Sequence, residues 1–198
     1  MNEAELHLDV PRWVYPLAVL TQLFTALAAG YVYLGALITF PVIAAGTAAL
    51  LLWLATSYRD PRRRTFLPWY LVLLVLVLAR GLEQWHFGYA ATLHQVFPGS
   101  FEPPVVFTER IQLAVFTLGA VSLSLIGALG LFFHHPLGNY MAWFLVCDAA
   151  VAGVVLVVLS FVSGHFHYIP GMVTGTPGFV LGLFCAVRLA RSPAKELP

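Results

Sequence analysis

Five charged side chains lie inside otherwise apolar stretches of the sequence, where a charge needs either a partner or a function. These residues are Arg80, Glu83, Glu109, Arg110 and Asp148. A charge near the centre of a bilayer costs about 2.5–3.5 kcal/mol even on lenient insertion scales. Ionisable groups that persist in such surroundings typically mark substrate sites, proton paths or obligatory ion pairs, so these five residues are the first candidates for chemistry.

Several further polar residues lie near these charges in the sequence. Arg80, Glu83 and Gln84 share one helical face by their spacing, and His86 follows Glu83 by three positions. Glu109 and Arg110 begin a later apolar segment, and the stretch GHFHY brings His165 and His167 to the end of another. We expect these segment ends to meet on one side of the membrane.

The residue types suggest roles for this predicted cluster. Glu83 and Glu109 would act as an acid/base pair or as metal ligands, with His86 and His165 as ligands or proton-transfer groups. Arg80 and Arg110 would hold the carboxylates or an anionic substrate, and His167 would bind a cofactor. The predicted metal ligands are therefore His86, His165, Glu83 and Glu109. His165 is expected to face the carboxylates, and His167 to be held by the Pro170–Gly171 turn.

Simple ion pairing is the structural alternative. Arg80 with Glu109, and Glu83 with Arg110, would fasten two helices together, because apolar surroundings make pairing obligatory. Asp148 has no lysine or arginine that the sequence places level with it. We expect Asp148 to be protonated, to hydrogen-bond Ser122 or Ser124, or to line a proton or substrate path.

The composition identifies the elements that must position these groups. Of 198 residues, 60% are hydrophobic and 10% are charged, against roughly a quarter charged in soluble domains. Six segments approach the about 20 apolar residues that a spanning helix needs. The sequence therefore predicts a single all-α domain over 1–198, a bundle of six transmembrane helices near 13–34, 36–57, 66–87, 105–133, 137–162 and 176–190.

Arginine placement predicts the orientation of this bundle. The loop SYRDPRRRTF and the end RLARSPAKELP are basic, and six helices put both on one side, which should be cytoplasmic. Both termini are then cytoplasmic, and the predicted cluster faces outward from the inner (plasma) membrane. His134 and His135, in FFHHPLGN, lie at the cytoplasmic end, where we expect them to close a helix before a turn at Pro136 and Gly138.

Two local resemblances bear on function. RGLEQ (80–84) and YIPGMVTG (168–175) resemble motifs of the HXXEE-domain family of small membrane proteins, presumed enzymes, with Arg80 in place of the histidine and Gln84 in place of the second glutamate. GHFHY and LGLFFHH resemble haem and copper ligand segments of haem-copper oxidase subunit I. That likeness would make His165 and His167 haem ligands and His134 and His135 copper ligands, but the predicted topology puts the two segments at opposite membrane faces.

These observations favour a membrane-embedded enzyme or redox-type protein that acts on a lipophilic molecule or quinone, with a transition metal or haem as the candidate cofactor. On this interpretation Glu83→Gln would abolish turnover and leave folding intact. The alternatives are an accessory cofactor- or pigment-binding subunit of a respiratory or photosynthetic complex, and the substrate-binding membrane subunit of a small-molecule importer. The net charge of +1 offers no argument for nucleic acid.

Overall fold

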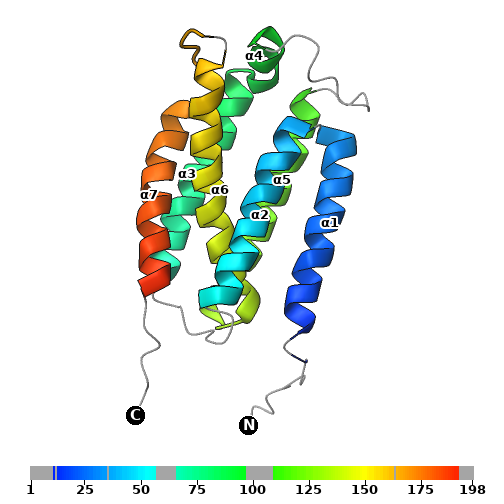
Figure 1. Cartoon of the computed structure of the whole chain (residues 1–198), viewed down its shortest axis with the longest axis vertical. Coiled ribbons are helices and arrows are strands. Elements are labelled where there is room, and N and C mark those ends of the chain that lie inside the picture. Colours follow the sequence, from blue (N-terminus) through cyan, green and yellow to red (C-terminus); the bar gives the residue numbers. More distant parts are fainter. Residues whose placement is uncertain are drawn as a thin grey trace.

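The structure, a computed structural model, describes residues 11, 13–34, 36–56, 66–96, 109–162 and 164–191. The described residues form helices and no strands, which confirms the all-α prediction (Figure 1). The helices are α1 (Val14–Leu34), α2 (Ala36–Thr56), α3 (Leu67–His86), α4 (Tyr89–Val96), α5 (Glu109–Phe132), α6 (Pro136–Phe161) and α7 (Met172–Arg191).

Within the described residues, four helical segments are long and apolar enough to cross a membrane. They are Thr39–Thr56, Leu67–His86, Pro136–Phe161 and Met172–Ala190. α1 and α5 contribute the shorter apolar stretches Val14–Ala28 and Val121–Phe132 to this part of the chain. The length and apolar composition of the four long segments are typical of an integral membrane protein.

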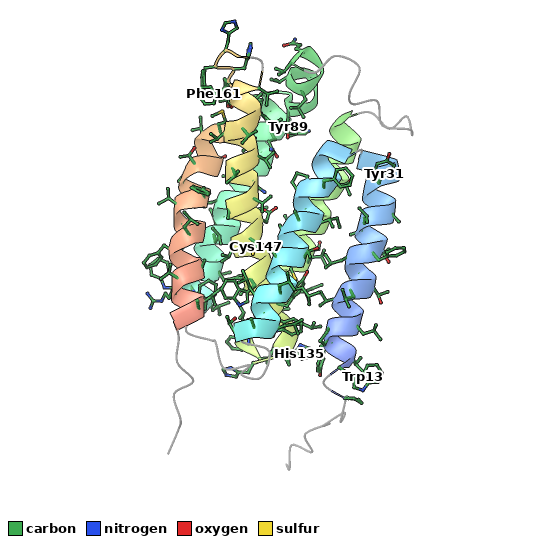
Figure 2. All side chains as sticks on the ribbon, in the orientation of Figure 1. Trp13, Tyr31, Tyr89, His135, Cys147 and Phe161 are labelled. Carbon is green, nitrogen blue, oxygen red and sulfur yellow. The ribbon has the colours of Figure 1, made fainter. Side chains whose placement is uncertain are left out.

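The long helices run up and down, and α6 lies at the centre of their packing. It contacts α2, α5 and α7, while α3 packs against α5, α6 and α7 (Figure 1). Trp13 and His135 lie at one end of the bundle, and Tyr89 and Phe161 lie at the other (Figure 2). We call these the His135 end and the Glu83 end, because α3 finishes three residues after Glu83 at the second of them.

Close helix packing around α6 depends on small residues and buried rings. A Cβ on Gly138 would collide with the backbone of Gly130, so the start of α6 can lie against the end of α5 only with glycine there. Trp53 of α2 is fully buried, and its ring centroid lies 5.6 Å from that of Tyr140. These contacts hold α6 in a defined register against its neighbours.

One helix boundary differs from the prediction, and one short helix was not predicted. α7 begins at Met172 rather than near residue 176, so Pro177 lies inside the helix and not in its first turn. The earlier start is possible because acceptors outside α7 satisfy its first amides, as described below. α3 ends at His86, as predicted, and Gly88, with a φ of 68°, then turns the chain into the short helix α4, which was not predicted.

Candidate functional site

The carboxylate of Glu83 is the centre of the polar contacts at the Glu83 end. Its Oε1 accepts hydrogen bonds from the Tyr168 hydroxyl at 2.5 Å and from the backbone amides of Gly171 at 2.8 Å and Val173 at 3.2 Å. Its Oε2 accepts from the amide of Thr174 at 2.9 Å and from the Thr174 hydroxyl at 2.5 Å. The Glu83 side chain is only 9% exposed, so these bonds replace its contact with water.

The start of α7 supplies three of these five donors. Gly171 has a φ of 101°, a conformation open to glycine, and there the chain turns from the α6–α7 connection into the helix. The first amides of a helix have no partner within it and carry its positive dipole end. Glu83 therefore caps α7 from another helix, which ties α3 to α7.

The hydrogen-bond capacity of Glu83 is fully used. An ionised carboxylate offers about four lone-pair sites, and five donors converge on this one. A metal ion or a substrate proton would have to displace one of these bonds. The arrangement suits a side chain that positions other groups, and Glu83 is in this sense an anchor for Tyr168 and α7.

Tyr168 joins this anchor to the surface. Its side chain is 42% exposed although its hydroxyl is held by Glu83, and its ring contacts that of Phe87 edge-on at 6.3 Å. Partial burial, together with the hydrogen bond to the charged carboxylate, raises the pKa of Tyr168 from 10.0 to about 12. The phenol therefore stays protonated well above neutral pH.

Titration of Tyr168 should follow from this shift. The folded state holds the phenolic proton more tightly than the unfolded chain, so this contribution to stability is complete below pH 10 and is lost as the pH rises toward 12. The difference in phenolate absorbance between the wild type and Tyr168→Phe should show one tyrosine that ionises near pH 12. A difference curve centred near pH 10 would contradict the contact with Glu83.

Asp148 has a partner that the sequence did not reveal. Its Oδ2 lies 2.6 Å from the Nη2 of Arg80, and the two side chains are 15% and 12% exposed. The prediction that no basic residue lies level with Asp148 is wrong, because the long Arg80 side chain reaches it from α3. The Ser122 hydroxyl, one of the predicted partners, instead donates to the carbonyl of Leu118.

The two structural ion pairs proposed from the sequence each involve a residue whose side chain lies outside the described structure. Among the described residues, Arg80 pairs with Asp148, and Glu83 binds the start of α7. The side chains of Glu109, Arg110 and Gln112 lie outside the part of the structure that is described, although Glu109 begins α5. The structure thus joins Arg80 and Asp148 in one pair, with Glu83 one helical turn farther along α3.

The histidines at the Glu83 end are exposed. His86 contacts the ring of Phe87 edge-on at 4.9 Å, and the amide of His167 donates to the carbonyl of Ser160 at 2.9 Å. The His165 side chain is exposed, and it is Tyr168 in this connection that donates to Glu83; that His165 faces the carboxylate stays a prediction. Among the residues that the structure describes, no three His, Cys, Asp or Glu side chains come close enough to hold a metal ion.

His134 and His135 close the turn between α5 and α6, as predicted. His134 has a φ of 57°, and the Nδ1 of His135 accepts from the amide of Leu137 at the start of α6. The His135 ring also packs edge-on against Tyr15 of α1. His135 lies at the opposite end of the bundle from Phe161, which immediately precedes the connection that carries His165 and His167 (Figure 2).

Tyr168 and Thr174 were missed as site residues, although both lie in the quoted segment YIPGMVTG. A threonine in the first turn after a Pro-Gly turn is a usual place for a side chain that helps to satisfy a helix start. That signal indicates a helix beginning near residue 172 and an external acceptor for its amides. It does not indicate which carboxylate that acceptor is.

Thr174 provides a test of the capping contact. Thr174→Val removes the hydroxyl that donates to Glu83 and should lower the free energy of unfolding by about 1.5–3 kcal/mol, the usual range for a hydrogen bond to a charged group. Thr176→Val is the matched control, because the exposed Thr176 hydroxyl donates to the carbonyl of Met172 in its own helix. Equal unfolding curves for the two variants in detergent micelles would contradict the assigned role of Thr174.

No protein-family model, curated protein or solved structure matches the chain. Function must therefore be inferred from the site: a buried carboxylate that anchors an exposed tyrosine, and an intramembrane ion pair next to it.

Proposed function

We propose that the protein is a membrane-embedded enzyme that acts on a lipophilic molecule at the Glu83 end, with Tyr168 as the residue that touches the substrate. The observation that carries this proposal is the exposed Tyr168 side chain whose hydroxyl is fixed at 2.5 Å from a buried carboxylate. The hydrogen bonds from Gly171, Val173 and Thr174 are enough to join α3 to α7, so the bond from Tyr168 is not needed for that purpose. The tyrosine adds a directed polar group that faces outward.

The chemistry that this pair supports is proton transfer. A substrate hydroxyl would donate a hydrogen bond to the Tyr168 oxygen, which Glu83 holds in place, and would pass its proton to an exposed imidazole as its own oxygen becomes the nucleophile. The exposed histidines His86 and His165 are candidates for exchanging that proton with the solvent.

The Arg80–Asp148 ion pair lies one helical turn from Glu83 and helps to position the same site. It joins α3 to α6, and its charges cancel within an apolar span. Because Arg80 lies one turn before Glu83 on α3, the pair fixes the rotation of α3 that directs Glu83 toward α7. We assign Arg80 and Asp148 a positioning role in the proposed enzyme.

The segments that resemble the HXXEE-domain family support this assignment. RGLEQ and YIPGMVTG are far apart in the sequence, and they meet through the hydrogen bonds of Glu83 with Tyr168, Gly171 and Thr174. We propose that the chain is a divergent relative of that family.

The proposed topology is that of six spans in the plasma membrane with the basic loop and both termini in the cytoplasm. The described chain supports it with six helices of 20 to 26 residues that alternate in direction. The start of α1 and the end of α7 lie at the His135 end (Figure 1). The positive-inside rule then directs the Glu83 end outward.

Incubation with a total membrane lipid extract tests the proposed enzyme. The protein in lipid nanodiscs should convert at least one lipid species, followed by mass spectrometry, and Tyr168→Phe should slow this conversion by about 10²–10⁴-fold, the usual contribution of a general acid–base group. Tyr31→Phe is the control, since Tyr31 is an exposed tyrosine at the same end of the bundle (Figure 2). Conversion at the same rate by both variants would refute the role of Tyr168.

A further inference from the structure

Large aromatic side chains are exposed around the Glu83 end, where α3 and α6 finish. We call this set the aromatic rim: Trp85 (50% exposed), Phe87 (58%), Phe161 (58%), Phe166 (61%) and Tyr168 (42%). Ring contacts hold its members in place, between Phe161 and Phe166 at 5.6 Å and between Phe87 and Tyr168 at 6.3 Å. The rim is therefore a fixed feature of the structure.

The rim is apolar and lies at the ends of two candidate spans, with Trp85 and Phe161 in their last turns and the other three residues just beyond them. The stretch QWHFGYAATLHQV after Glu83 and the stretch FVSGHFHYIPG from Phe161 onward together carry the rim, and neither contains a lysine, arginine, aspartate or glutamate. Exposed aromatic rings flanked by histidines and no charge match the chemistry of the interface between lipid headgroups and chains, where aromatic residues gather. In water, so much exposed aromatic surface would be unusual. Lipid is thus the surrounding that fits the rim.

Tyr168 belongs both to the rim and to the Glu83 site. Its hydroxyl proton is committed to Glu83, so the phenolic oxygen offers a lone pair to a hydrogen-bond donor. This acceptor lies at the ends of two candidate spans, at the depth where the polar group of an amphiphile sits. A molecule without a polar head would instead favour the middle of the membrane.

We infer that the substrate class of the proposed enzyme, on which this inference rests, is an amphiphile with a hydroxyl or protonated amine. It enters sideways from the leaflet at the Glu83 end, donates a hydrogen bond to the Tyr168 oxygen and lays its chain against Phe87 and Phe166. The neutral aromatic rim favours the hydrocarbon chain of the amphiphile, and the Tyr168 oxygen favours a polar head that donates a hydrogen bond.

The depth of the rim is the first measurement. Phe166→Cys can be labelled with bimane selectively, because both native cysteines, Cys147 and Cys185, are buried. In phosphatidylcholine vesicles, headgroup nitroxide lipids should quench this bimane strongly and aqueous iodide weakly. Bimane at Val154→Cys, on the exposed face of α6, is the control and should respond to nitroxides deep in the chains. Dominant iodide quenching at position 166, or quenching by neither agent, would overturn the inference, the second because another protein surface then covers the rim.

Binding is the second measurement, with dodecan-1-ol and dodecane as matched probes. The alcohol should change the bimane signal at position 166 saturably, and the alkane should not. Tyr168→Phe should weaken this response roughly fivefold, the effect of one neutral hydrogen bond. Phe87→Ala, which leaves the contacts of Glu83 in place, should also weaken it, and this keeps the test decisive if Tyr168→Phe misfolds. Equal responses to alcohol and alkane would overturn the inference.

The two proposals fail separately. Alcohol binding that depends on Tyr168, without conversion of any lipid, would leave the binding site standing and refute the enzyme. Lipid conversion without alcohol-selective binding would leave the enzyme standing and refute the inferred amphiphile site.

Discussion

Glu83→Gln should lower the free energy of unfolding by about 3–5 kcal/mol, the usual cost of removing one partner from a buried charged contact. The glutamine side chain has the same shape, but it brings an NH₂ group where every neighbour already donates. At least one donor among Tyr168 and the first amides of α7 then loses its acceptor. Denaturant unfolding in detergent micelles, followed by circular dichroism, measures the loss.

This expectation reverses the one drawn from the sequence, by which Glu83→Gln would spare folding and remove only turnover. A rescue experiment separates capping from other effects. Glu83→Ala leaves room for a small carboxylate, so formate should restore part of the lost stability, and chloride at equal ionic strength should not. A Glu83→Gln variant as stable as the wild type would show that the hydrogen bonds to α7 contribute little.

The ion pair between Arg80 and Asp148 should behave as a coupled unit. Arg80→Met or Asp148→Leu alone leaves one charge without its partner in an apolar span, and each should cost about 3–5 kcal/mol. The double variant removes both charges and should recover most of that loss, because apolar side chains of similar volume can replace a buried pair at little cost. A double-mutant cycle on unfolding free energies measures the coupling.

Arg188→Met is the matched control for this cycle. Arg188 is exposed at the other end of the bundle, with its guanidinium carbon 5.2 Å from the ring centroid of Trp69. Its removal should cost about 0.5–1 kcal/mol, the range for an exposed cation–π contact. Losses at Arg80 and Asp148 that simply add in the double variant would show that the two charges do not depend on each other.

The sequence by itself determined the class of protein and most of the helices. Apolar runs of about 20 residues are a local property, and so is the shared face of Arg80, Glu83 and Gln84 on one helix. The turn at His134 and His135 was also predictable, because proline and glycine stop helices through their own backbone geometry. These features needed no knowledge of which helices touch.

Only the tertiary structure decided which groups the charges meet. Arg80 reaches Asp148 because α3 packs beside α6, and Glu83 reaches the start of α7 because α3 also packs beside α7. Three of the five donors to Glu83 are backbone amides, those of Gly171, Val173 and Thr174. Every residue except proline has such an amide, so residue types alone cannot show that these three lack a partner within their helix and lie beside a carboxylate.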